Sequence, residues 1–67
     1  MAKSKLEIFK ETLVQAQELR QDVVLFVGNN SFCGSVRFIS DSTVTIKDND
    51  VIHDIDLEAV TVISVSN

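Results

Sequence analysis

The side chains in this sequence that could do covalent or metal chemistry are few and do not cluster. The chain contains a single cysteine, Cys33, and a single histidine, His53, which fall in different predicted strands. A structural zinc site needs four such ligands, so the chain alone cannot build one. Because no third group is placed to orient a base, we interpret Cys33 as a small half-buried packing residue and His53 as a surface or interface residue.

The carboxylates offer two further possibilities. Asp54 and Asp56 share one face of a predicted strand and could pair as general acid and base, but such residues more often keep a strand soluble or meet Lys or Arg of a neighbour. The segment Asp48-Asn49-Asp50 lacks the glycine and the final glutamate of a calcium loop, which favours a hairpin tip. No nucleophile, base and orienting group occur at workable spacing. We therefore predict no enzymatic activity, no metal, no cofactor and no small-molecule substrate.

The glycines and the basic residues of the predicted strands do not indicate one particular function. Neither Gly28 nor Gly34 begins a phosphate-binding loop, because no Gly-Lys-Ser/Thr follows, and we interpret them as turn and bend residues. Arg37 and Lys47 either face solvent or contact phosphate, and the sequence leaves both alternatives open.

Length and charge limit the classes of protein that remain. With 67 residues the chain forms one domain, residues 1–67, and 45% hydrophobic residues with no Pro are enough for a folded core. A domain of this size usually needs a disulfide, a metal or self-association, and one cysteine excludes an internal disulfide. We therefore expect self-association. The net charge of −4 argues against a broad basic surface, so any contact with nucleic acid must be local.

The apolar segments also bear on location. They are far shorter than the roughly twenty residues that cross a bilayer, and the charges of Lys3, Lys5 and Glu7 interrupt the N-terminus. We expect no membrane partner and no secretory signal. A lone thiol fits a reducing compartment, so the predicted location is cytoplasmic.

One helix is predicted, at the N-terminus. The spacing of Ser4 and Glu7 is that of a capping box, in which the Ser4 hydroxyl accepts from the Glu7 amide. The helix then covers residues 5–19, or 4–19 with its cap. Its apolar stripe consists of Leu6, Phe9, Leu13 and Ala16, widened by Ile8 and Leu19.

From residue 22 onward the hydrophobic period becomes that of strands, and β-branched residues dominate. We predict strands at 23–27, 32–39, 43–47, 51–56 and 60–65, each joined to the next by a hairpin, with a single helical turn at 57–59. Gly34 permits a sharp bend in the second strand. The predicted core face of that strand holds Phe32, Val36 and Phe38, and the other face holds Cys33, Ser35, Arg37 and Ile39.

The predicted fold class follows from these elements. It is mainly β: an N-terminal α-helix at residues 4–19 followed by a small, strongly bent five-stranded antiparallel barrel at residues 22–65. The last predicted strand carries no charge and no Pro to keep another chain away. Pairing of this strand with a different edge of the next copy would close a ring. The predicted subunit-interface residues are Ile52, Val60, Val62, Ile63 and Val65.

The order of short motifs suggests a family. A hydrophobic strand at 23–27 is followed by the turn Gly28-Asn29-Asn30, the run Gly34-Ser35-Val36-Arg37-Phe38-Ile39 and the turn Ser40-Asp41-Ser42 before an apolar strand. Residues 51–53 later lead into a closing segment at 57–63. Across residues 4–65 this arrangement resembles the Sm-like (LSm) superfamily, nearest its bacterial Hfq branch.

The resemblance implies a function and a set of contact residues. Members form homo-oligomeric rings, here of roughly five to seven subunits, that bind single-stranded RNA without catalysis. Phe26 could stack on a base, and the Asn amides could read base edges. The positions that match the family's RNA-binding residues are Leu25, Phe26, Asn29, Asn30, Ser31 and Cys33 on one face and Asp41 and Ser42 in the loop of the other.

Three positions depart from the family pattern. Ser40 stands where the family favours Asp, and no stacking residue stands at Ser42 and Thr43. The basic pair of the pore-side turn is replaced by Leu57-Glu58, and a carboxylate repeated around a pore would repel phosphate. We therefore prefer the first of the two faces for RNA. The alternative hypothesis is a ring that acts as a non-RNA assembly or protein-interaction adaptor.

Overall fold

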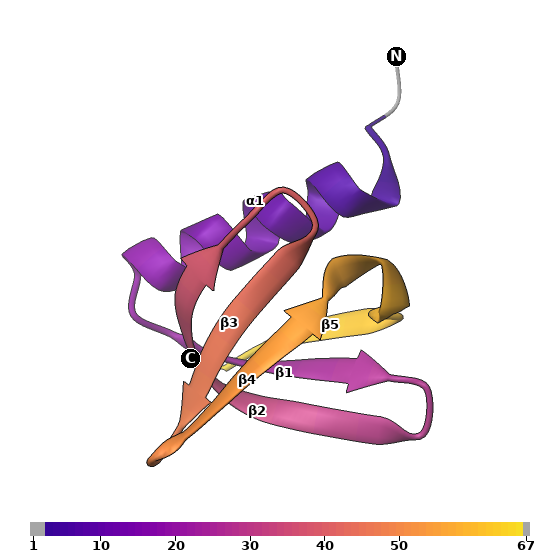
Figure 1. The fold of residues 1–67 in the computed structure, drawn as a ribbon. Coiled ribbons are helices and arrows are strands. Elements are labelled where there is room, and N and C mark those ends of the chain that lie inside the picture. The colour runs from indigo at the N-terminus through magenta and orange to yellow at the C-terminus, as the bar shows by residue number, and fades with distance from the viewer. Residues whose placement is uncertain (1–2, 67) are drawn as a thin grey trace.

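The computed structural model describes residues 3–66 and consists of one helix followed by five antiparallel strands (Figure 1). This confirms the predicted fold class as a mainly β arrangement with an N-terminal helix. The elements are α1 (Lys5–Glu18), β1 (Asp22–Val27), β2 (Asn30–Ile39), β3 (Thr43–Asp48), β4 (Val51–Asp56), the 3₁₀ turn η1 (Leu57–Ala59) and β5 (Val62–Val65).

Helix α1 begins at the predicted cap and lies across one end of the sheet, packed mostly against β2 (Figure 1). The Ser4 hydroxyl accepts a hydrogen bond from the Glu7 amide at 3.2 Å. Leu13 and Ala16 are buried, with Leu6 and Phe9 packed beside them. Ile8 and Leu19, predicted to widen this stripe, are instead 49% and 60% exposed. The buried stripe is narrower than predicted because Leu19 already caps the helix and Ile8 lies about 100° around the axis from Phe9.

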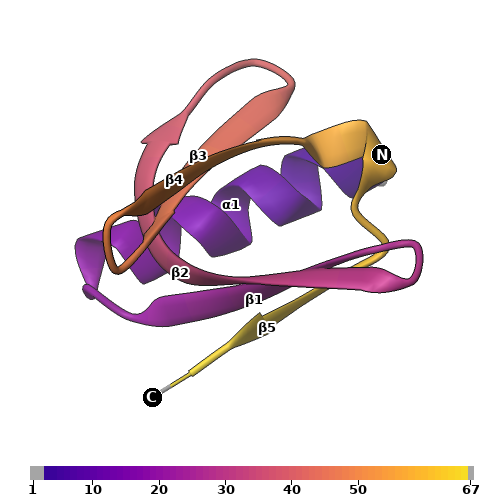
Figure 2. The same cartoon turned by 60° about the horizontal axis from the view of Figure 1, so that its bottom comes forward.

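The strands form one sheet in the order β4-β3-β2-β1-β5. Hairpins join β1 through β4, but β5 crosses to pair with β1, so the expected hairpin between the last two strands is wrong. The turn η1 redirects the chain there, with the Asp56 carboxylate accepting from the Glu58 amide at 3.0 Å. β4 and β5 are therefore the two borders of an open sheet, which is neither closed nor as strongly bent as the predicted barrel (Figure 2).

A β-bulge in β2 changes which residues face the core. The register runs from Val36 opposite Ile46 directly to Phe38 opposite Thr45, which leaves Arg37 without a partner. An extra residue reverses the alternation of side chains beyond it. Phe32 and Val36 lie on the core side as predicted, but Phe38 is 72% exposed and Ile39 packs on the core, the reverse of the prediction.

The core is a single apolar cluster to which the helix, all strands except β5, and the segment around η1 contribute. Gly34 lies where β2 crosses β3, and a Cβ atom there would come within 2.4 Å of the Lys47 carbonyl oxygen. No larger residue fits without a backbone shift, so a close backbone contact accounts for this glycine, and the bend predicted there stays a prediction. The fully buried side chains of the cluster are Leu13, Val23, Leu25, Val44, Ile46 and Val60, and Ala16, Val36, Ile55 and Leu57 are nearly so.

Candidate nucleic-acid interface

The β1–β2 hairpin presents an outer face to which β5 adds a third strand. In β1, Val23 and Leu25 point into the core, so Val24 and Phe26 point outward. Residues paired across antiparallel strands share a face. The pairing therefore gives two outward rows, Ser31–Phe26–Val62 and Cys33–Val24–Ser64. We call these six residues the hairpin face.

The hairpin face combines apolar and polar groups and carries no charge. Phe26 is 39% exposed and its cross-strand neighbour Val62 is 53% exposed. Ser31 and Cys33 are exposed beside them. An exposed aromatic ring next to hydroxyl groups can bind unpaired bases, by stacking and by hydrogen bonds to base edges.

The tip of the hairpin continues this surface. Val27 pairs with Asn30, so the loop consists of Gly28 and Asn29, and Gly28 adopts the positive φ of 59° that such tight turns require. Among residues 3–66, the side chains of Asn29, Asn30 and Ser31 make no hydrogen bond within the chain, and all three are exposed. Their donors and acceptors are available to a ligand.

The prediction that Leu25 contacts RNA is wrong. Its side chain has no exposed surface, because it lies on the core side between Phe32 and Ile63. The alternation that exposes Phe26 therefore buries Leu25. The contact set on this side contracts to Phe26, Asn29, Asn30, Ser31 and Cys33.

Asp41 and Ser42 lie apart from these residues, in the loop after β2. The ten residues of β2 separate this loop from the hairpin tip, a path of roughly 30 Å in an extended strand. The loop closes with a bond from the Ser40 amide to the Thr43 carbonyl, 2.8 Å, and the Leu57 amide donates to the Ser42 carbonyl at 2.8 Å. The structure thus places Asp41 and Ser42 next to η1, where Glu58 is exposed, and does not join them to the hairpin face.

The predicted interface residues divide into three groups. Val62 on β5 and Ile52 on β4 are 53% and 54% exposed, at opposite borders of the sheet. Ile63 and Val65 are half-buried against the chain's own core. Val60 is fully buried and precedes β5 rather than belonging to it, so its side chain serves this core and not a neighbouring subunit.

His53 and Cys33, the two residues first considered for catalysis, lie in packing and surface positions. His53 is half-buried with its ring 5.1 Å from that of Phe32, a tilted aromatic contact. Cys33 is exposed, not half-buried as predicted, because it points away from the core at its place in β2. Within residues 3–66 no cluster of His, Cys, Asp and Glu could hold a metal ion, and no helix of that range is long and apolar enough to cross a bilayer.

Two members of the hairpin face, Val24 and Ser64, were not singled out from the sequence. Ser64 joins the face because β5 pairs with β1, a long-range contact that no local pattern encodes. The strand alternation of 23–27 could have indicated Val24. Comparison of the chain with protein-family models and with curated proteins gives no match.

Proposed function

We propose that this chain is the subunit of an Sm-like homo-oligomeric ring, of roughly five to seven copies, that binds single-stranded RNA on the hairpin face without catalysis. The observation that carries the proposal is the strand order, which puts β4 and β5 at the two borders of one sheet. Each copy then offers two different edges for a head-to-tail contact.

Both borders expose apolar side chains, and β4 also carries the exposed Asp54 and Asp56. β5 contains only Val62, Ile63, Ser64 and Val65, with no charge to discourage pairing. On β4, Val51 and Ile52 are 53% and 54% exposed. Addition of β5 from one copy to β4 of the next would satisfy the backbone groups of both edges and remove this apolar surface from water.

The hairpin face supports RNA as the ligand. Stacking of a base on Phe26 would contribute about 1–3 kcal/mol, and the tip amides can discriminate base edges. Because Val62 lies at the β5 border beside Phe26, the face reaches the proposed subunit contact. In a ring, neighbouring faces would then follow one another closely enough for a single strand of RNA to pass from one to the next.

Light scattering tests the ring. A mass several times 7.4 kDa is expected, and a stable monomer would contradict the proposal. Val62→Asp and Ile52→Asp, one at each border, should both dissociate the assembly. Phe38→Asp is the matched control, because Phe38 is 72% exposed but lies on the inner strand β2; this variant should keep the parent mass.

Fluorescence anisotropy with oligo-A and oligo-U at two salt concentrations tests the RNA ligand. We expect binding of oligo-A at micromolar protein with a shallow salt dependence, because the hairpin face neutralises no phosphate. Absence of binding to either RNA while the ring persists would reject RNA and favour the adaptor hypothesis.

The adaptor hypothesis has one specific observation in its favour. Asp54, Asp56 and Glu58 are all exposed along β4 and η1. A ring that repeats these carboxylates would repel phosphate on that side and attract basic segments of a protein partner.

A further inference from the structure

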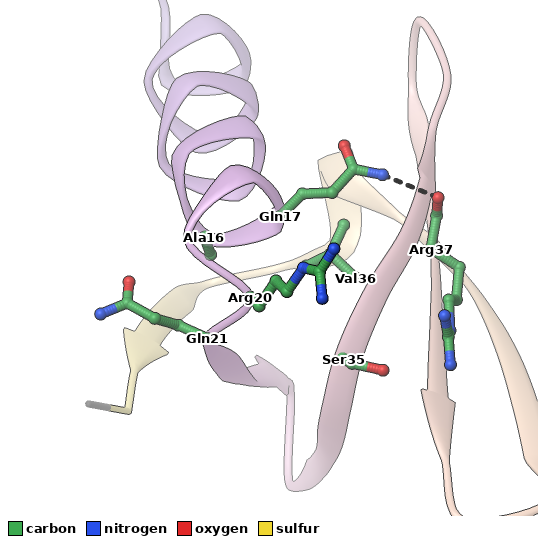
Figure 3. A pocket seen from close by; sticks show the side chains of 7 residues that line it. All are labelled: Ala16, Gln17, Arg20, Gln21, Ser35, Val36 and Arg37. Carbon is green, nitrogen blue, oxygen red and sulfur yellow. Dashed lines mark hydrogen bonds between the residues drawn. The ribbon is translucent and has the colours of Figure 1, made fainter.

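A second polar site lies outside the hairpin face, between the end of α1 and the middle of β2 (Figure 3). It is a half-open cavity of about 500 Å³, within the size range of small-ligand sites. Ala16 and Val36 supply its apolar part. Gln17, Arg20, Ser35 and Arg37 supply its polar part (Figure 3).

Both arginines of the chain line this one cavity. The protein has ten Asp and Glu residues, yet among residues 3–66 neither guanidinium forms an ion pair or a hydrogen bond. Figure 3 shows the Arg20 side chain extending from the helix end across the space toward β2. Two guanidinium groups without partners that line one cavity from residues far apart in the sequence can both contact an oxyanion bound there.

The backbone of Arg20 is unfavourable for an arginine. Its φ is 56°, in the left-handed region that ends a helix and that glycine adopts without steric cost. The conformation is held by hydrogen bonds of this turn, from the Arg20 amide to the Gln17 carbonyl at 3.2 Å and from the Gln21 amide to the Ala16 carbonyl at 2.9 Å. A long charged side chain at this position therefore has a local penalty that a ligand contact would explain.

Arg37 also occupies an irregular position, since it is the extra residue of the β2 bulge. Bulges redirect the side chain that they carry. The Arg37 carbonyl, released from the strand ladder, accepts a hydrogen bond from the Gln17 side-chain amide at 2.8 Å (Figure 3). Gln17 thus fixes the bulge to the helix and sets the distance between the two elements that carry the arginines.

The remaining charges around the cavity nearly cancel. Ser35 is flanked across the sheet by Asp22 on one side and Lys47 on the other. The C-terminal end of α1 carries a partial negative charge of about one half, which two guanidinium charges outweigh. Ser35 adds a hydroxyl whose contact with the Lys47 carbonyl is long, at 3.5 Å, so it can turn to a ligand at little loss.

We propose that this cavity is a binding site for a small oxyanion, with a phosphate group as the preferred ligand, held by Arg20 and Arg37 and supported by the Ser35 hydroxyl. A tetrahedral phosphate can accept from two separate guanidinium groups and a hydroxyl at once, which a single planar carboxylate does less well. The site is independent of the proposed RNA function, since it uses none of the residues of the hairpin face.

The test is an NMR titration of the full chain with inorganic phosphate at constant ionic strength. Saturable shifts of the Gln17, Arg20, Ser35 and Arg37 amides are expected, with no such shifts from chloride. Arg20→Gln and Arg37→Gln should each weaken binding roughly ten- to hundred-fold. Lys5→Gln is the control, because it removes the same charge from the exposed start of α1. Succinate that binds as tightly as phosphate would overturn the assignment to phosphate.

Arg20→Gly separates loss of the ligand from loss of the fold. Glycine suits the left-handed backbone at this position, so the variant should melt at a higher temperature than the parent while losing phosphate binding. Unchanged phosphate affinity in Arg20→Gly and Arg37→Gln, or shifts that never saturate, would overturn the site. No RNA is present in these measurements, so their outcome is separate from that of the RNA experiments.

Discussion

The β1–β2 hairpin and the β4–η1 segment are both mainly β-strand, but they differ in the charge of their side chains. Residues 23–34 contain no charged side chain. Residues 48–58 contain half of the ten acidic residues and no Lys or Arg; the five are Asp48, Asp50, Asp54, Asp56 and Glu58. In the sheet, β3 lies between β4 and the β1–β2 hairpin. A net charge of −4 therefore describes neither of them.

The two regions also use their polar groups differently. In the acidic segment, Asp54 accepts a hydrogen bond from the Thr45 hydroxyl at 2.6 Å, and Asp56 caps η1. Asn29, Asn30 and Ser31 of the hairpin make no such bond within residues 3–66. Polar groups of the acidic segment thus stabilise the fold, whereas those of the hairpin are available to a ligand. For this reason the distribution of charge along the chain locates a candidate interface that the net charge does not.

The largest expected effect concerns the junction between the two regions. Gly34→Ala would place a methyl group 2.4 Å from the Lys47 carbonyl oxygen and 3.2 Å from the Asp48 amide. Both contacts are with backbone atoms and cannot be relieved by a side-chain rotation. We expect a loss of about 3 kcal/mol or more in the free energy of unfolding, measured by urea denaturation.

Gly28→Ala at the hairpin tip is the matched control. No atom lies within 4 Å of the added methyl group, so only the positive φ of 59° is penalised. A loss of about 1 kcal/mol is expected. Equal losses in the two variants would mean that the close crossing of β2 and β3 does not hold the two regions together.

Local features of the fold could be predicted from the sequence because local physics determines them. The Ser4 cap and the 3₁₀ turn at Leu57–Ala59 each depend on a few neighbouring residues. The strands followed from the period of two and from β-branched composition. Their limits were predicted within one or two residues.

Features that depend on distant parts of the chain could not be predicted. The bulge at Arg37 has no glycine or other local signal, and it exposes Phe38 and packs Ile39 against the core, contrary to expectation. The last strand pairs with β1 only from Val62 onward, so Val60 lies outside it. The same pairing adds Val62 to the hairpin face. For the candidate site, family position alone selected Leu25, whereas strand alternation buries it.

A smaller effect is expected from Phe26→Ala, which tests whether the uncharged region is the RNA contact. Phe26→Ala should weaken oligo-A binding roughly ten- to hundred-fold, the equivalent of about 1–3 kcal/mol for one stacked base. Because Phe26 is 39% exposed, the fold should persist. The measurement is fluorescence anisotropy on samples shown by circular dichroism to be folded.

Phe38→Ala is the comparison variant. Phe38 is the same kind of side chain, is 72% exposed, and lies beyond the β2 bulge rather than on the hairpin face or at a border of the sheet. It should bind oligo-A like the parent. An affinity loss as large as that of Phe26→Ala would mean that the hairpin face is not the specific RNA contact.

The smallest effect is expected at Glu58, three residues before the chain contacts β1. Glu58 precedes Thr61 by three residues, and the Thr61 amide and hydroxyl both donate to the Phe26 carbonyl, at 2.8 and 3.1 Å. Glu58 is therefore the acidic side chain of the β4–η1 segment nearest in sequence to this contact, and Asp50 at the β3–β4 tip is remote from it along the chain. An exposed charge at such a position contributes about 0.2–1 kcal/mol. Glu58→Gln should raise oligo-A affinity about two-fold at low salt, and less at 0.15 M, where the screening length is about 8 Å.

Asp50→Asn removes the same charge and should leave the affinity unchanged at both salt concentrations. If it raised the affinity as much as Glu58→Gln, the RNA would have to run along the acidic segment itself. The uncharged hairpin would then be a surface with some other occupant, and the exposed carboxylates of β4 would limit RNA binding. Anisotropy titrations of the two variants side by side distinguish these outcomes, because they compare one charge at two places on the same sheet.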